Sequence, residues 1–455
     1  MGLFLSVYKG GISGLAPFTL LLALLTSGCR APQKPSERQA RAEFQTIESR
    51  YRPTNAPIAL PTLTEDSPLG DFLTVALFRQ PRVEAAYYDW AASVERITVE
   101  RSRPDPRLTF KTDIQDTIVS LIPGLMVDLP GPGKLTARAD VAAAESNVRY
   151  HAYAAALLQV AYDTKRAAYQ LRFLADKLAV NRGNLSLVND LEVLARSQYE
   201  IGRVTLQDVL RAQMESDRLT TEIANLEDSR TPLMAQLRTA LGFRSGEADP
   251  PIPRQLESTP LALNSDQLLN TALARNPRLQ GMEAEIRLAD AGIRLARKSR
   301  VPDFTAGLEV DAKAQPVMVT PQAGMTLPIW RDKLAAELAA AQATKRAATA
   351  RLSGEQIQLA VDLADRLFSY REATRNLSLI RDRLLSKARM SIEVARTAYL
   401  SGKTDFLNLI EAQRTLLAIQ LSEAEARTQR ELSLAEISLM IVGQPPTNAP
   451  VLNPK

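Results

Sequence analysis

The amino-acid sequence predicts an α+β membrane protein in which one large structural unit occurs twice and assembles into an oligomeric tube. Three observations predict it: two very long Ala-rich helical patterns, two pairs of strands that alternate apolar and polar residues, and a set of motifs that recurs about 200 residues later. A helix of about 65 residues spans roughly 100 Å. Such a helix cannot bury itself in a compact domain, so it needs parallel neighbours.

The composition excludes several classes of function. The chain has 455 residues and a formal net charge of +5, with basic and acidic residues interspersed as on solvated helix faces, so we expect no nucleic-acid partner. One Cys and one His are too few for a zinc site or a redox pair, and we expect no metal and no cofactor. His151 lies in a helical pattern and is expected to be a packed or surface residue. No arrangement of catalytic residues is found, so we expect no enzyme activity.

The N-terminus predicts a lipoprotein signal peptide over residues 1–28. A basic residue precedes the apolar run Ala16–Leu25, and small residues then precede Cys29, the only Cys of the chain. This order resembles bacterial lipoprotein signals, in which that Cys becomes the lipid-modified first residue. A plain signal peptide followed by a chance Cys is the alternative. Because Arg30 follows the Cys where an inner-membrane protein usually has Asp, the resemblance implies sorting to the outer membrane.

The rest of the chain divides into repeat 1 (66–242) and repeat 2 (266–443), joined by a linker at 243–265. The Pro-rich segment 29–65 has little periodicity and is expected to be a tether or an extended strap, and the tail 444–455 is similar. Each repeat begins with a short helix, followed by a helix that a Pro opens. The distance between matching motifs drifts from 196 to 200 residues, which implies small insertions between the copies.

Each repeat then predicts two strands, at about 106–130 and about 303–328. Leu108 and Phe110 alternate with polar residues in repeat 1, as Phe304 and its neighbours do in repeat 2. Two-faced strands without a soluble covering layer are typical of a membrane barrel with lipid outside and a polar lumen. Four strands cannot close a barrel, whereas three chains would supply twelve.

Long helices are expected from about 135 to 199 and from about 332 to 399, and each is followed by a returning helix. A Tyr-x-x-Gly motif lies at both turns, with Ala-Gln ten and eleven residues after the Gly. Gly at these places permits the positive φ of a turn, so the tips are predicted at 199–205 and 399–405.

These features, in this order and in duplicate, resemble the TolC-like outer-membrane efflux protein family and its lipoprotein subgroup. The resemblance covers about residues 66–443. It implies a homotrimer with a twelve-stranded β-barrel in the outer membrane that continues into a long twelve-helix α-barrel in the periplasm. It also implies an exit duct for small molecules that works with a periplasmic adaptor protein and an inner-membrane pump.

The same resemblance implies two sites. At the tips, a helical hairpin of the adaptor would dock on Tyr199, Gly202, Arg203, Tyr399, Gly402 and Lys403. Beside them, a periplasmic gate would comprise Asp208, Arg211, Asp405, Asn408 and Glu411. Arg211 on a neighbouring helix is a candidate partner for Glu411, and this pair would lock the closed state. Ordinary solvated helix charges are the alternative.

Two other functions remain open at this point. One is a type I protein secretion duct, and the other is a periplasmic coiled-coil scaffold or adaptor lipoprotein that never inserts. Adaptors usually carry one hairpin and lipoyl-like β modules, whereas this chain has two hairpins and two-faced strands.

Overall fold

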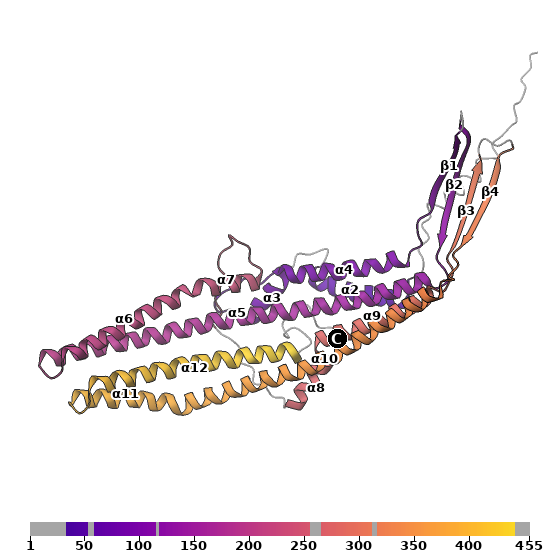
Figure 1. Cartoon of the computed structure of the whole chain (residues 1–455). Coiled ribbons are helices and arrows are strands. Elements are labelled where there is room, and N and C mark those ends of the chain that lie inside the picture. The colour runs from indigo at the N-terminus through magenta and orange to yellow at the C-terminus, as the bar shows by residue number, and fades with distance from the viewer. Residues whose placement is uncertain (1–32, 53–58, 115–117, 255–264, 312–315, 442–455) are drawn as a thin grey trace, which may run out of the picture.

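The chain is elongated, with a four-stranded sheet at one end and two helical hairpins that reach their tips at the other (Figure 1). None of the described helices combines the length and the apolarity that a membrane-crossing helix needs. Cys29, the tail at 444–455 and parts of the predicted tether and linker lie outside the described residues. The computed structural model describes residues 33–52, 59–114, 118–254, 265–311 and 316–441.

The two repeats present their elements in the same order. Repeat 1 contains α3 (Leu69–Arg79), α4 (Pro81–Arg101), β1 (Arg107–Ile114), β2 (Ile118–Leu129), α5 (Lys134–Glu200), α6 (Leu206–Asp228) and α7 (Arg230–Leu241). Repeat 2 contains α8 (Ser265–Arg275), α9 (Pro277–Lys298), β3 (Phe304–Asp311), β4 (Met318–Met325), α10 (Arg331–Leu379), the π-helix η1 (Ile380–Leu384), α11 (Leu385–Leu400) and α12 (Phe406–Ile441). The long helices, the returning helices and the strand pairs that periodicity predicts are therefore present.

Two interruptions distinguish the repeats, and neither follows from periodicity. In repeat 1 the returning helix breaks at Ser229, because Pro232 cannot donate a hydrogen bond to the carbonyl of Asp228. In repeat 2 the long helix contains η1, whereas α5 is α-helical throughout. A π-turn adds a residue to a helix without ending it. The π-helix η1 thus absorbs part of the drift between the repeats.

The segment expected to be an extended tether contains a helix, α2 (Pro35–Tyr51), which corrects the prediction for residues 29–65. Pro35 occupies the first turn, where no N–H is needed. Phe44 and Tyr51 lie two turns apart on one helical face. This face packs against the core that α3, α4, α5 and α7 form, and the Tyr51 side chain is fully buried there.

The helix α2 runs antiparallel to α4, with its first turn near the sheet. The buried carboxylate of Glu37 accepts a hydrogen bond from the Thr98 hydroxyl at 3.1 Å and lies 3.0 Å from Nε of Arg101. Farther along, Arg41 donates to both carboxylate oxygens of Glu95 at 2.9 and 3.0 Å. Because α4 leads directly into β1, the chain enters the described fold at the sheet end of the helical body.

The largest core lies around the middle of α5 and is rich in aromatic rings. Trp90 stacks on Tyr153 with a centroid distance of 5.9 Å, and both side chains are almost completely buried. The only His of the chain, His151, is half-buried beside this cluster. Burial and the charge of Arg287 lower the pKa of His151 to about 4, so its imidazole is neutral at neutral pH. The structure therefore places His151 in a packing role.

The four strands form one antiparallel sheet in the order β1-β2-β3-β4, so the two repeats meet where β2 pairs with β3. The register aligns residues of like polarity across the strands. One aligned row is Leu108, Leu125 and Leu308, and the row one residue farther along β1 is Thr109, Gly124 and Glu309. Apolar rows and polar rows therefore point to opposite faces of the sheet.

The two faces of the sheet have different surroundings. On the polar face, Lys111 reaches across β2 to form an ion pair with Glu309. On the apolar face, the side chains of Leu108 and Phe110 are 64% and 65% exposed, and that of Leu308 is 47% exposed. The sheet therefore carries an apolar face that no described part of the chain covers.

The helices nearer the tips form a single layer in the order α6, α5, α12 and then α10, which η1 and α11 continue to the tip, because α5 packs against α6 and α12, and α12 packs against α10 and α11. We call this arrangement the helical layer, and α6 and α10 are its edges. Both edges expose apolar side chains in the described chain: Leu206, Leu210 and Met214 on α6, and Ile357, Val361 and Phe368 on α10.

Candidate functional site at the hairpin tips

Both hairpins turn through the same backbone structure. Gly202 and Gly402 follow the long helices with φ of +74° and +72°. Each Gly N–H donates to the carbonyl of the Tyr three residues earlier, at 2.9 Å for Tyr199 and 3.0 Å for Tyr399. The next N–H donates to the carbonyl five residues earlier, at 2.9 and 2.8 Å. These bonds form the Schellman motif, which ends a helix at a Gly in the left-handed region, so both long helices end in a turn at their Gly.

Both turns are open to solvent. A Cβ atom at Gly202 or Gly402 would meet no heavy atom within 4 Å. The neighbouring cationic residues Arg203 and Lys403 are exposed. Each tip thus presents a glycine turn and a positive charge to the solvent.

The two tips differ in what they bury. Tyr199 is 44% exposed, whereas Tyr399 is 4% exposed and packs against Phe406 with a ring centroid distance of 5.3 Å. Repeat 1 has Leu206 at the position of Phe406, and this Leu is 51% exposed. The other five of the six expected docking residues are exposed, and Tyr399 is an internal packing residue of its tip.

Three of the expected gate residues are brought together across the two tips. Asp208 and Arg211 of α6 form an ion pair at 3.6 Å. Burial raises the pKa of Asp208, the guanidinium of Arg211 opposes this, and the carboxylate of Asp405 from repeat 2 raises it further. Burial, with a smaller contribution from the charge of Asp208, also raises the pKa of Tyr399 to about 12. The tips therefore meet around a half-buried carboxylate whose pKa is raised above the usual Asp value.

Glu411 and Arg211, the candidate ion pair, do not contact each other within the chain. The carboxylate of Glu411 lies 3.3 Å from Nη1 of Arg414, one turn farther along α12. Arg414 also donates to the carboxylate of Glu215 on α6 at 2.7 and 3.1 Å. Asn408 donates to the hydroxyl of Thr404, one turn earlier in the chain, at 2.8 Å. Within one chain, Arg414 is thus the partner of Glu411.

Glu215 is the centre of this ion cluster. Its side chain is 1% exposed, and it accepts a second hydrogen bond, from Arg218 at 2.7 Å. Burial raises the pKa of Glu215, but the hydrogen bonds and charges of Arg218 and Arg414 outweigh it and hold the pKa below its usual range. The cluster ties α6 to α12, which α5 otherwise separates in the helical layer. Periodicity cannot reveal such a contact, since Glu215 has the local sequence of a solvated helix charge.

The duplicated Ala-Gln motif has a structural role at about the same level along the helices as the ion cluster around Glu215. Gln213 of α6 donates to Glu192 of α5 at 3.0 Å. The matching Gln413 of α12 is completely buried and donates to Asn184 of α5 at 3.4 Å, while Asn184 donates to Gln420 at 2.7 Å. Both returning helices therefore use the repeated Gln to contact α5.

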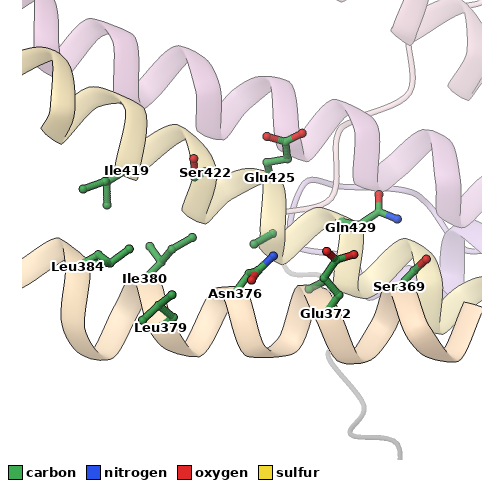
Figure 2. Close-up of a pocket in the computed structure, with 12 residues that line it drawn as sticks. Ser369, Glu372, Asn376, Leu379, Ile380, Leu384, Ile419, Ser422, Glu425 and Gln429 are labelled. Atoms are coloured by element: carbon green, nitrogen blue, oxygen red, sulfur yellow. The ribbon is translucent and has the colours of Figure 1, made fainter.

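A groove lies farther from the tip, between α10 and α12 and beside η1 (Figure 2). Glu411 and Glu425 are four turns apart and lie on nearly the same face of α12, because 14 residues rotate by close to four full turns. The groove and the expected gate residue therefore face the same side of the helical layer. The groove has a volume of about 560 Å³ and is lined by Ser369, Glu372, Ala373, Asn376, Leu379, Ile380, Leu384, Ile419, Ser422, Glu425, Ala426 and Gln429.

Two segments of the chain, residues 73–243 and 268–442, match the sequence profile of the outer membrane efflux protein family. The chain belongs to this family. The matched segments correspond to the two repeats and include both tips and both strand pairs. The TolC-like resemblance inferred from the motifs is thus confirmed, and this outer membrane efflux protein has the fold of a channel family.

Solved outer-membrane channels have the same fold. The channel OprN superposes with a TM-score of 0.72 at 17% identity, covering 82% of this chain and 90% of OprN. CusC gives a TM-score of 0.72 at 15% identity, covering 85% of this chain and 95% of CusC. The open state of MtrE from Neisseria gonorrhoeae gives 0.69 at 16% identity, covering 85% of this chain and 97% of MtrE. At these identities the likeness concerns the fold alone.

A curated relative is similar over part of its length. The multidrug resistance outer membrane protein MdtQ of Escherichia coli O157:H7 is 26% identical over 207 residues. The match spans 42% of this outer membrane efflux protein and 42% of MdtQ. It therefore supports the membership of the family without transferring the activity of MdtQ to this chain.

Proposed function

We propose that this outer membrane efflux protein is a homotrimeric exit duct of a tripartite efflux system for small molecules. One observation carries the proposal: both the sheet end and the helical end of the chain leave edges and apolar surfaces that further copies of the chain could cover. Within the described part of the chain, the sheet has unpaired edges at β1 and β4 and an uncovered apolar face, and the helical layer has two apolar edges. Three copies would close a barrel of about twelve strands, whose apolar face would meet lipid, and would continue it into a tunnel.

The exposed part of the tips is the surface that would receive the adaptor hairpin. Tyr199, Arg203 and Lys403 are exposed there, and the glycine turns leave room for close backbone approach. An inner-membrane pump would deliver the exported molecule to this end. Neither the adaptor docking nor the duct requires an enzyme activity of this chain.

The gate is proposed to lie just beyond the tips, on the face of α12 that carries Glu411. In a trimer, three copies of Glu411 would approach one another, and like charges at close range are costly unless they are paired or hydrated. Arg414 pairs with Glu411 and with the buried Glu215. This geometry supports Arg414 as the residue that holds the closed state, with Asp208, Arg211, Asp405 and Asn408 around it.

We also propose that Cys29 carries a lipid anchor in the outer membrane. Cys29 lies outside the described residues, but α2 begins six positions later and its first turn lies at the sheet end of the helical body. A chain of six residues spans at most about 20 Å. A lipid attached to Cys29 would therefore stay close to the sheet end and to the membrane around the proposed barrel.

The oligomeric state gives the sharpest test of the duct. Native mass spectrometry in detergent should find a trimer, and the purified trimer should conduct ions in a planar bilayer. A monodisperse folded monomer that forms no pore would refute the duct and would favour a periplasmic scaffold. Export of a protein substrate instead of small molecules would favour a type I secretion duct.

A further inference from the structure

We propose that the groove between α10 and α12 binds organic cations that have an apolar body, on the inner face of the tunnel. The inference deepens the proposed duct, because it names a class of transported molecule and a place where it would bind. It rests on the proposed function only for the statement that the groove faces the lumen.

The lining of the groove combines an apolar half with an acidic half (Figure 2). Leu379, Ile380 and Ile419 provide apolar surface beside η1. Glu372 and Glu425 provide the only charged side chains of the lining, and both are negative. A volume of about 560 Å³ lies within the range of small-molecule sites, roughly 300–1,000 Å³. The occupant that matches this surface is a cation with an apolar body.

The two carboxylates of the groove have no cationic partner in the described chain. Neither Glu372 nor Glu425 forms an ion pair or a side-chain hydrogen bond with any described residue. By contrast, Glu423, two residues before Glu425, binds Arg381 at 2.8 Å and Arg427 at 2.9 Å. Arg381 and Arg427 are therefore engaged by Glu423 rather than by the groove, and the two groove carboxylates keep their negative charge for a ligand.

The side of the helical layer on which the groove opens follows from the contacts that the opposite sides of α10 and α12 make. Arg371 of α10 donates to the hydroxyl of Ser265 on α8 at 2.6 Å, and Arg254 of the linker lines a second cavity together with Arg427 of α12. At 100° per residue, Asn376 points about 140° away from Arg371, and Glu425 points about 160° away from Arg427. The groove thus opens on the face of the helical layer opposite to α8 and the linker, which is the inner face once the layer closes into a tunnel.

The π-helix explains why repeat 2 has this groove at this place. Leu379 directly precedes η1, and Ile380 and Leu384 belong to it, so the wide turn forms the apolar end of the groove. π-turns are frequent at functional sites because they re-aim side chains within a continuous helix. Since α5 has no π-helix, a trimer would carry three such grooves rather than six.

Tetraphenylphosphonium and tetraphenylborate provide a matched pair of probes, since they have nearly the same shape and size and opposite charge. Binding of each to the purified full-length protein would be measured by equilibrium dialysis at a constant detergent concentration. The test variant is Glu372→Gln/Glu425→Gln. The control variant is Glu393→Gln/Glu222→Gln, which removes the same charge from exposed residues outside the groove. Leu379→Ser tests the apolar half while the charges stay.

The wild-type protein and the control variant should bind the phosphonium ion at least about tenfold more tightly than the borate. An exposed charge pair contributes up to about 1 kcal/mol, so each carboxylate should account for about a three- to fivefold effect, and the test variant should lose about tenfold. Leu379→Ser should weaken the binding of both probes. Equal phosphonium binding by the test and control variants, or equal binding of both probes by the wild type, would overturn the proposal.

Pore formation by the same samples separates this inference from the proposed duct. A trimer that conducts in a planar bilayer but shows no cation preference overturns the groove and leaves the duct intact. Phosphonium binding that depends on the two carboxylates, in a protein that forms no pore, overturns the duct and the lumenal placement. In a conducting trimer, partial block by phosphonium that the test variant loses supports both.

Discussion

The ion cluster around Glu215 leads to the most specific prediction, the effect of Arg414→Gln on the gate. Glu215 is 1% exposed and keeps the bond from Arg218 in this variant, so it is not left without a partner. The lost bonds are charge-assisted, but Arg414 is 47% exposed, so their contribution should be about 1–2 kcal/mol per chain. If three chains open together, the sum of at least about 3 kcal/mol shifts the open-to-closed ratio by roughly a hundredfold.

Single-channel recording in planar bilayers measures this shift directly. Arg414→Gln should raise the open probability strongly, because it removes the tie between α6 and α12. Arg218→Gln is the matched control: it removes the same charge and a bond to the same carboxylate, but Arg218 and Glu215 lie on one helix. Equal open probabilities for the two variants would refute the reasoning, since the effect would then depend on charge rather than on the tie.

The pH dependence provides a second readout of the same cluster. The pKa of Glu215 is lowered in the folded protein, so its carboxylate stabilises the closed tips above the usual Glu range. This stabilisation is lost as the pH falls through the lowered pKa. The wild-type channel should therefore open more often in acid, and Arg414→Gln should show a weaker response to pH because part of the interaction is already absent.

The glycine turns, the half-buried carboxylate of the tips and the N-terminal Cys each have a measurable consequence. Gly202→Val and Gly402→Val place a β-branched residue at positive φ, which costs about 1–2 kcal/mol in the turn but meets open space. Export and adaptor crosslinking should fall while the native mass stays that of a trimer, and unchanged export would contradict the docking role. The raised pKa of Asp208 means that the tips become more stable as the pH falls from neutral toward the usual Asp range. Asp208→Asn should therefore slow hydrogen exchange at the tips at neutral pH and remove this pH dependence. Faster exchange in the variant would refute the assignment. Mass spectrometry of the mature N-terminus should find diacylglycerol on Cys29, and an unmodified N-terminus at another residue would exclude the anchor.

Elements with a strong local signal could be predicted from the sequence. The alternation around Leu108 has a period of two, and the two tip glycines need positive φ, so their structures follow from short stretches of chain. The helix α2 was harder to predict, because Pro35 and the later prolines of its segment are typical of a tether, while its apolar face becomes favourable only against the core around Tyr51. The helical content of a segment that depends on a partner surface is a tertiary property.

The ion pairs beside the tips could not be predicted from the sequence. Asp208 and Glu411 lie on the returning helices just past the tips, and Glu411 contacts Arg414 rather than Arg211 within the chain. Charged residues one turn apart have the same periodicity whether they are solvated or bonded across a layer, so only the ion pair that Arg414 of α12 makes with Glu215 of α6 distinguishes Arg414. The burial of Tyr399 is equally invisible, since it depends on Phe406 of the same tip.

The unequal tips show what a fused pair of repeats permits that a ring of identical short subunits does not. In a ring of identical copies, every substitution appears at all equivalent positions at once. One copy therefore cannot acquire a residue suited to binding while the next acquires a residue suited to burial. Here the chain carries an exposed Tyr199 and a buried Tyr399 at corresponding places. Covalent duplication thus lets two corresponding positions evolve apart, with one Tyr exposed at its tip and the other buried by internal packing.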